Sequence, residues 1–155
     1  MFSKIKWFGL TALGAVGIAA GIALTGQSPP AGPATEITVY RSPSCGCCIK
    51  WVDHVEAAGF RATVIDVENL AEVKAMNGIT ATLGSCHTAI ADGYVIEGHV
   101  PASDIRRLLE ERPAVAGLAV PGMPTGSPGM EGPNPQPYDV LAFDKSGRVE
   151  VFARH

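Results

Sequence analysis

The sequence predicts a single α/β domain over residues 36–155. Two observations favour this fold class. Strand-like alternation and helix-like spacing of apolar residues follow one another in the order strand, helix, strand, helix, hairpin, helix. In addition, 46% of the chain is hydrophobic, and the roughly 120 residues that follow the N-terminal segment suffice for one domain with its own core.

The first half of the domain contains two predicted strands with a helix between them. Strands are expected over residues 36–40, where polar and apolar side chains alternate, and over 60–67. The helix is expected from about Cys47 until Gly59, which ends it. Its apolar stripe consists of Cys48, Trp51, Val52 and Val55.

A short helix follows the second strand. Asn69 is expected to cap it, because Glu72 comes three residues later, as in a capping box. Gly78 is expected to end this helix, and Met76 is expected to lie on its buried face.

A hairpin and a further helix complete this part of the chain. Strands over residues 88–91 and 94–96 flank the dipeptide Asp92-Gly93, which is typical of a tight hairpin. The helix is expected over residues 103–112, capped by the serine at its first position.

This order of elements is the thioredoxin or glutaredoxin arrangement, in which the first strand leads into a helix whose first turn holds Cys45 and Cys48. Residues 118–137 follow as a loop that contains glycine, proline and methionine and shows no periodicity. A loop of that length inside a domain is usually functional or disordered. A C-terminal hairpin is expected from residues 138–143 and 148–153.

The N-terminal residues 1–26 are predicted to form a signal peptide or an N-terminal membrane anchor, because Lys4 and Lys6 precede an apolar run without charge. A buried core helix is disfavoured, since the run is apolar on every face and leads into a proline-rich linker over 27–35. We therefore expect export of residues 36–155, either as a soluble domain or tethered by that one segment.

The overall charge argues against one class of partner. The chain has a formal net charge of −3 and no basic patch that would neutralise phosphates. The sequence therefore predicts no nucleic-acid partner, and a membrane contact only through the N-terminal segment if it is not cleaved.

Four cysteines carry the strongest functional signal: Cys45, Cys47, Cys48 and Cys86. An exported protein usually pairs its cysteines, but two stabilising disulfides fit this clustering poorly because the adjacent Cys47 and Cys48 cannot easily bridge each other. Thiolates in such a cluster bind copper(I), zinc or iron–sulfur clusters, or exchange disulfides.

Copper is the metal that the pattern favours. The segment before the third strand, residues 83–88, lacks the proline that redox members of the thioredoxin fold usually place there, and we expect Cys86 to point at Cys45 and Cys48 instead. Thiolate and thioether groups both select copper(I). Neighbouring Cys47 and Cys48 suit a multinuclear cluster in which thiolates bridge several copper ions.

Two alternatives remain beside copper. A structural zinc site normally uses two separated ligand pairs, which this spacing matches poorly. A thiol–disulfide oxidoreductase is the stronger rival, with Cys45 as the nucleophile and Cys48 as the resolving thiol, in which case these two would be catalytic. Metal binding without an enzymatic role is the preferred interpretation.

Histidine and methionine side chains are secondary candidates for capping or relaying the metal: His87, His99, Met123 and Met130. Trp51 is expected to pack behind the site. His54 is expected to be a solvated surface residue, and no role is assigned to His155 at the chain end.

Four longer motifs add a resemblance to these observations: residues 42–48, 85–89, 93–102 and 117–131. They resemble the CopG-type periplasmic copper-resistance proteins, and the resemblance spans residues 36–153. It implies a thioredoxin-like domain with a cysteine-bridged, multinuclear copper site whose ligands fall on Cys45, Cys47, Cys48 and Cys86. It also implies a periplasmic role in copper resistance, through copper redox cycling or sequestration, beside other copper-handling proteins.

Overall fold

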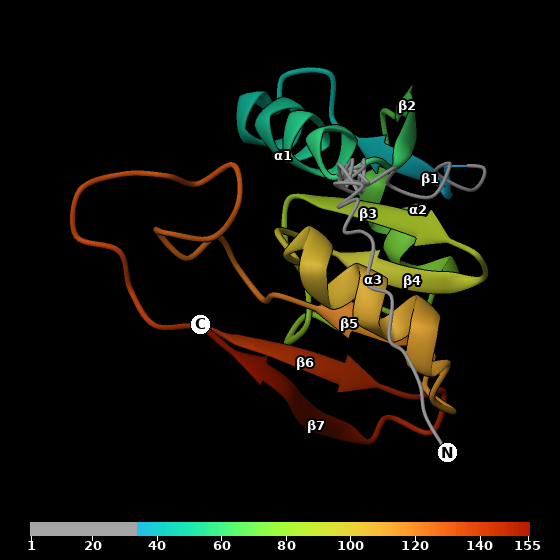
Figure 1. Cartoon of the computed structure of the whole chain (residues 1–155). Coiled ribbons are helices and arrows are strands. Elements are labelled where there is room, and N and C mark those ends of the chain that lie inside the picture. Colours follow the sequence, from blue (N-terminus) through green and yellow to red (C-terminus); the bar gives the residue numbers. More distant parts are fainter. Residues whose placement is uncertain (1–33) are drawn as a thin grey trace, which may run out of the picture. The chain divides into compact units, whose positions relative to one another are not determined.

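The computed structural model describes residues 34–155, which form a mixed α/β domain (Figure 1). The predicted signal peptide or anchor over 1–26 and nearly all of the linker lie outside the described residues. Within residues 34–155, no helix combines the length and the hydropathy that crossing a membrane requires.

Seven strands and three helices make up the described part of the chain. The strands are β1 (Glu36–Arg41), β2 (Arg61–Asp66), β3 (His87–Ala91), β4 (Tyr94–Glu97), β5 (Gly117–Ala119), β6 (Asp139–Phe143) and β7 (Val149–Arg154). The helices are α1 (Gly46–Ala57), α2 (Leu70–Met76) and α3 (Ala102–Glu111). The predicted α/β class and the predicted order of elements from 36 to 111 are thus observed.

All seven strands join in one sheet with the order β2-β1-β3-β4-β5-β6-β7. The β1–β2 and β4–β5 pairs are parallel, and the other four pairs are antiparallel. Because β1 is followed at once by α1, and β3 is its antiparallel neighbour, the start of α1 and the start of β3 lie at the same end of the sheet.

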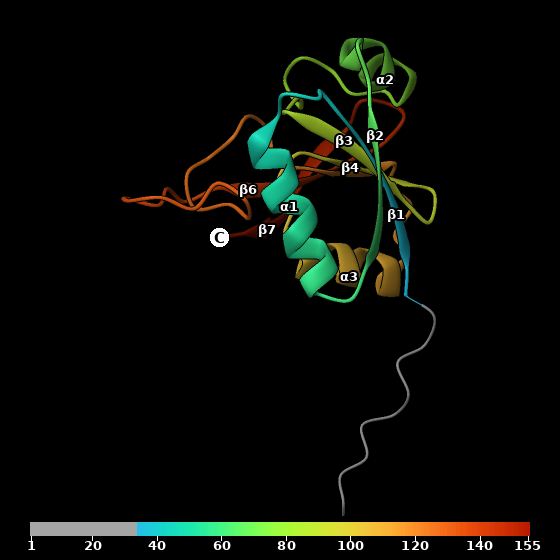
Figure 2. The same ribbon diagram turned by 90° about the horizontal axis from the view of Figure 1, so that it is seen from above.

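Two hydrophobic clusters cover the two faces of this sheet. The larger one joins α1 and α3 to the sheet through side chains such as Trp51, Val55, Ile105 and Leu108. The smaller one, on the other face, includes Ile79, Leu83 and Val95. Figure 2 shows α2 apart from the neighbouring helices α1 and α3. The segment that leads from α2 into β3 therefore crosses the face opposite to α1.

Several local predictions are confirmed. The Asn69 side chain accepts a hydrogen bond from the Glu72 backbone N–H at 3.3 Å. Asp92 and Gly93 have φ angles of 46° and 85°, as the predicted tight hairpin turn requires. The predicted apolar stripe of α1 is its buried face: Cys48, Trp51, Val52 and Val55.

Other local predictions are wrong. Met76 is 80% exposed, because the short helix α2 buries none of its side chains. Helix α3 begins at Ala102 with Pro101 as its N-cap, so Ser103 lies inside the helix. The predicted loop from residue 118 also overlaps β5, where Gly117 is required because an added Cβ would lie 2.7 Å from the carbonyl carbon of Val95.

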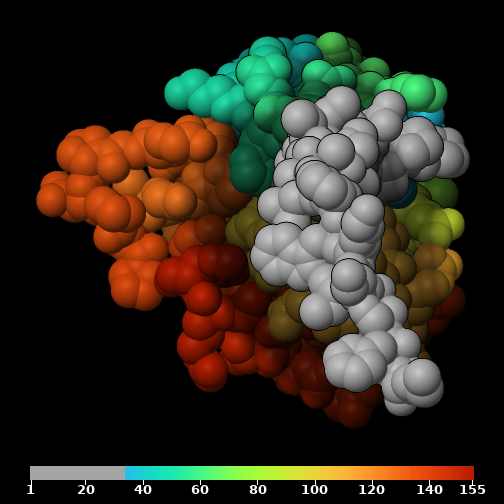
Figure 3. Space-filling view, viewed as in Figure 1, coloured from blue at the N-terminus to red at the C-terminus, as the bar shows by residue number. Residues whose placement is uncertain are grey.

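The glycine- and proline-rich segment between β5 and β6 carries no helix or strand. In the space-filling view of Figure 3 it forms a protruding edge, in orange, beside the first helix. Its approach to α1 is close at Gly129, whose φ of +83° and lack of a Cβ bring its backbone against the start of that helix. This loop therefore packs next to the cysteines of α1.

Candidate metal centre

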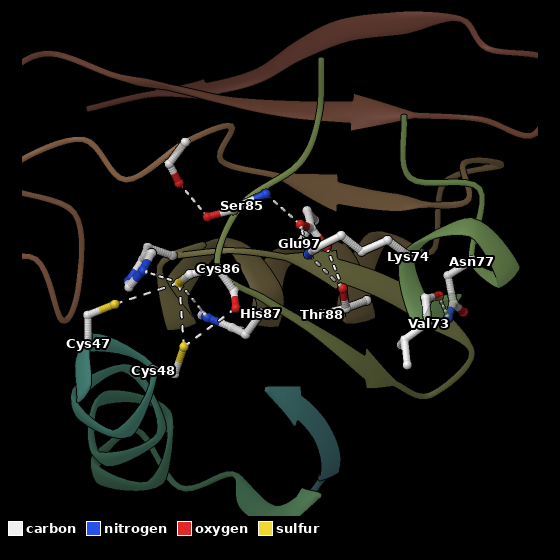
Figure 4. Close-up of polar contacts among 12 residues, drawn as sticks. Cys47, Cys48, Val73, Lys74, Asn77, Ser85, Cys86, His87, Thr88 and Glu97 are labelled. Atoms are coloured by element: carbon white, nitrogen blue, oxygen red, sulfur yellow. Dashed lines mark hydrogen bonds and ion pairs between the residues drawn. The ribbon is translucent and has the colours of Figure 1, made fainter. Parts of the chain in front are cut away.

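The four cysteines meet where α1 begins and β3 begins. Cys45 is the N-cap residue of α1. Cys47 and Cys48 lie in the first turn of this helix, and Cys86 immediately precedes β3 (Figure 4). All four Sγ atoms lie within 4.8 Å of one another. Cys86 Sγ is 3.7 Å from Cys47 Sγ and 3.5 Å from Cys48 Sγ.

Two of the four cysteines are oxidised in this structure. A disulfide joins Cys45 to Cys48, whose Cα atoms are 5.5 Å apart, one helical turn from each other. All cysteines of the chain belong to the described residues, and Cys47 and Cys86 remain thiols. Disulfide sulfurs are not thiolates, so binding of a metal by all four residues requires prior reduction by two electrons and two protons.

Burial controls the protonation of the thiol on the β3 side. Cys86 is half-buried, and desolvation, followed by the neighbouring Cys47 thiol, raises the pKa of Cys86 to about 12. The metal-free Cys86 is therefore a neutral thiol near pH 7. A bound soft metal ion would replace this proton, since metals bind the thiolate and release the proton to solvent.

His99 is oriented as a potential ligand beside Cys86. Its Nδ1 lies 2.7 Å from the Pro128 carbonyl oxygen, which only accepts, so Nδ1 carries the proton and donates. Its Nε2 therefore presents a lone pair, and this atom lies 2.9 Å from Cys86 Sγ. A backbone carbonyl that fixes the tautomer is the usual support for a metal-binding imidazole.

His87 approaches the same sulfur from the first position of β3. Its Nδ1 is 3.3 Å from Cys86 Sγ, and its ring lies against the Trp51 ring in a tilted arrangement, with the two centroids 4.4 Å apart. Burial lowers the pKa of His87 well below its usual value and also lowers the pKa of His99, so both rings are neutral near pH 7. Within residues 34–155, the buried Nε2 of His87 has no hydrogen-bond partner. Cys86, His87 and His99 thus form a second group with metal-binding geometry.

The two methionines differ in their positions. Met130 lines a cavity of about 670 Å³ together with Cys47, Lys50 and Glu131, whereas Met123 is 51% exposed. Met130 thus lines the same cavity as one of the cysteines. Met123 does not belong to the residues that line this cavity.

Two histidines for which the sequence predicted no structural role form hydrogen bonds in the fold. His54 Nε2 accepts a hydrogen bond from the Ala102 backbone N–H at 3.0 Å, so the prediction of a solvated surface residue is wrong. The first N–H groups of a helix have no carbonyl acceptor within the helix. For the first residue of α3, the His54 imidazole nitrogen is the acceptor instead. At the chain end, His155 Nε2 lies 2.7 Å from Asp104 Oδ2.

Sequence reasoning missed two residues next to the cysteines. Pro128 acts through its backbone carbonyl, for which the sequence carries no signal. Glu97 is fully buried behind Cys86. A signal for Glu97 did exist, since it is a charged residue that directly continues the apolar strand run ending at Ile96.

Comparison with known proteins assigns the chain to a family. Residues 83–130, which include Cys86 and both site histidines, match the family described as "Protein of unknown function, DUF411". Two solved structures, "Copper resistance protein copG- Form 2" and "Copper resistance protein copG- Form 1", share 44% sequence identity with this chain at TM-scores of 0.75. The matches cover 79% and 80% of this chain, respectively, and 98% of each of those chains. No curated protein sequence matches. The chain belongs to the CopG family of copper resistance proteins.

Proposed function

We propose that this chain binds copper(I) through Cys45, Cys47, Cys48 and Cys86 and thereby contributes to copper resistance. The observation that carries the proposal is the approach of all four Sγ atoms to within 4.8 Å of one another in a member of a copper resistance family. Thiolates are soft ligands that favour copper(I), and the neutral imidazoles of His87 and His99 are suited to complete the coordination.

Copper is the cargo of this site rather than a resident cofactor. Reduction of the Cys45–Cys48 disulfide would supply two further sulfur ligands beside Cys47 and Cys86. Adjacent Cys47 and Cys48 favour a multinuclear cluster, because sulfurs on consecutive residues are better placed to bridge different copper ions than to share one tetrahedral ion. The alternative ligand group of Cys86, His87 and His99 does not need the disulfide to be reduced.

The fold that presents the site is proposed to be thioredoxin-like. The support is the chain order of elements from β1 to α3, the parallel β1–β2 pair, and the position of β3 between β1 and β4 in antiparallel orientation to both. In that arrangement the segment before β3 faces the start of α1, as it does here.

Export to the periplasm is part of the same proposal. It is supported by the N-terminal charge and hydropathy pattern over residues 1–26, as a cleaved signal peptide or a retained anchor. The proposed partners are copper ions and other periplasmic copper-handling proteins. Fractionation of cells that express the full chain, followed by mass measurement of the mature protein, tests location and cleavage together.

A copper titration tests the binding function. Reduced protein is titrated anaerobically with copper(I) against a chromophoric chelator, and the copper per chain is measured by mass spectrometry. We expect Cys86→Ser to lower the bound copper, whereas His54→Ala, which removes a histidine outside the cysteine group, retains it. Equal copper content in the two variants would refute the proposed site.

A second candidate function is thiol–disulfide exchange, and the observed Cys45–Cys48 disulfide favours it. Cys48 is fully buried and Cys45 is half-buried, which suits a resolving thiol and an attacking thiol, respectively. This function predicts fast reduction of insulin disulfides by the metal-free reduced protein, with an unchanged rate in Cys47→Ser. Slow reduction by that protein would leave copper binding as the function that the site supports.

A further inference from the structure

A buried ion pair lies directly behind the Cys86 segment. The side chain of Glu97, at the end of β4, is fully buried, and that of Lys74, from α2, is 17% exposed. Glu97 Oε1 accepts hydrogen bonds from Lys74 Nζ and, at 2.6 Å, from the Ser85 backbone N–H. Glu97 Oε2 accepts a hydrogen bond from Thr88 Oγ1 at 2.7 Å (Figure 4).

The partners of this carboxylate converge on one short segment. Ser85 and Thr88 flank Cys86 and His87 on both sides, and Lys74 Nζ also donates to Thr88 Oγ1 at 3.1 Å. A buried carboxylate is costly unless it is paired and hydrogen-bonded, and both oxygens of Glu97 are satisfied here. Through these hydrogen bonds the Glu97 carboxylate and the Lys74 ammonium group connect the residues on either side of the Cys86–His87 dipeptide to β4 and α2.

The same segment is held from a second side. Gly84 O accepts a hydrogen bond from Gly122 N at 3.0 Å, and Ser85 Oγ donates to Gly122 O. The segment over 83–88 contains no proline that would restrict its backbone. Residues 87 and 88 are held by pairing with β1, and His87 O accepts a hydrogen bond from Gly98 N at 3.0 Å. Before Cys86, the backbone is held by the bonds of Gly84 and Ser85, and among these only the Glu97 bond involves a charged group.

We propose that Glu97, with Lys74 as its counter-ion, is a positioning residue that holds Cys86 in reach of Cys47, Cys48 and His99. Loss of the Ser85 hydrogen bond would free the backbone immediately before Cys86. The Sγ contacts of 3.5 Å to Cys48 and 2.9 Å to His99 would then be lost together. The expected effect of Glu97 on copper(I) affinity rests on the proposed function, but its expected effect on the position and reactivity of the Cys86 thiol does not.

The first measurement is the copper(I) affinity of the reduced protein. Glu97→Ala removes the acceptor and is expected to weaken copper(I) binding about 10- to 100-fold, the usual effect of removing support behind a metal ligand. Glu97→Gln retains an amide oxygen for the Ser85 N–H and is expected to lie between Glu97→Ala and the wild type. A general loss of stability, by contrast, would lower copper(I) affinity to a similar extent in a variant that removes a buried carboxylate elsewhere in the fold.

The matched control is Asp104→Asn. Asp104 is a second buried carboxylate, but its partners are His155 and Arg107. This variant removes a comparable charge without touching the Cys86 segment. We expect it to lower stability while leaving copper(I) affinity unchanged.

The second measurement does not need copper. In the metal-free protein with the Cys45–Cys48 disulfide intact, only Cys47 and Cys86 react with iodoacetamide, and peptide mass spectrometry gives the rate for each. Glu97→Ala should accelerate alkylation of Cys86 at least about tenfold relative to Cys47. The reason is that loss of a hydrogen bond to a charged group frees the backbone before Cys86 and exposes its half-buried thiol to the reagent more often. Asp104→Asn should leave the ratio of the two rates unchanged.

The two measurements separate the possible failures. An unchanged Cys86-to-Cys47 ratio in Glu97→Ala, or an equal change in Asp104→Asn, would overturn the positioning role. If the wild type binds no copper(I), the proposed function fails, and the alkylation ratio still decides the role of Glu97. If Glu97→Ala does not fold, the ratio in Glu97→Gln decides it in the same way, with a rise supporting the role and a wild-type value overturning it.

Discussion

Substitution of Gly129 by alanine is expected to loosen the loop from α1 and to destabilise the domain. Gly129 has a φ of +83°, which disfavours any residue with a Cβ. An alanine Cβ at this position would also lie 2.9 Å from Cys47 O and 2.8 Å from Trp51 N. Both of these neighbours are backbone atoms of α1, so relief requires the loop to move away from the helix.

The expected loss can be worked out from these two effects. The positive φ costs about 1 kcal/mol for alanine. The clash with helix backbone resembles overpacking, which costs about 1–3 kcal/mol. The free energy of unfolding should therefore fall by about 2–4 kcal/mol in Gly129→Ala.

Gly147→Ala isolates the first of the two effects. Gly147 has a φ of +89°, and an added Cβ there meets no atom within 4 Å. This variant should lose only about 1 kcal/mol. Urea unfolding of both variants, with the disulfide kept oxidised, measures the two losses. Equal losses in Gly129→Ala and Gly147→Ala would show that the loop does not press against α1 and would refute the reasoning.

Three further predictions concern hydrogen bonds and protonation around the site. Trp51→Phe should lower the free energy of unfolding by about 1–2 kcal/mol, because Trp51 Nε1 donates to Val100 O at 2.9 Å in a fully buried position; urea unfolding checks this value. His54→Ala should cost about 1–2 kcal/mol in the same assay, since the Ala102 N–H loses its acceptor. Burial lowers the pKa of His54 and His87 below the ordinary imidazole value of 6.5, so the folded state favours the neutral rings. The free energy of unfolding should therefore be at its full value above that pH and fall as the pH drops below it, and His54→Ala should reduce the slope of this fall. A urea midpoint that rises on acidification from pH 7.5 to 5 would contradict this last prediction.

Much of the local structure was predictable because it depends on neighbours in the chain. The Asp92-Gly93 turn, the Asn69 cap and the buried stripe of α1 all follow from spacings of a few residues. The same holds for the proximity of Cys45 to Cys48, which lie one helical turn apart. Where the local pattern was weak, as in the short strand β5, the prediction failed, since three residues carry no readable period.

The sequence by itself determined which residues are candidates for the chemistry, namely the thiols, the imidazoles and the methionines of one loop. The tertiary structure alone decided how they meet: Cys86 Sγ lies between Cys48 Sγ and His99 Nε2, and Met130 rather than Met123 shares a cavity with Cys47. It also decided that His54 caps α3 and that Met76 lies in solvent. The reason is that these contacts depend on strand pairing, on backbone carbonyls such as that of Pro128 and on the buried Glu97, and such long-range partners leave no periodic trace along the chain.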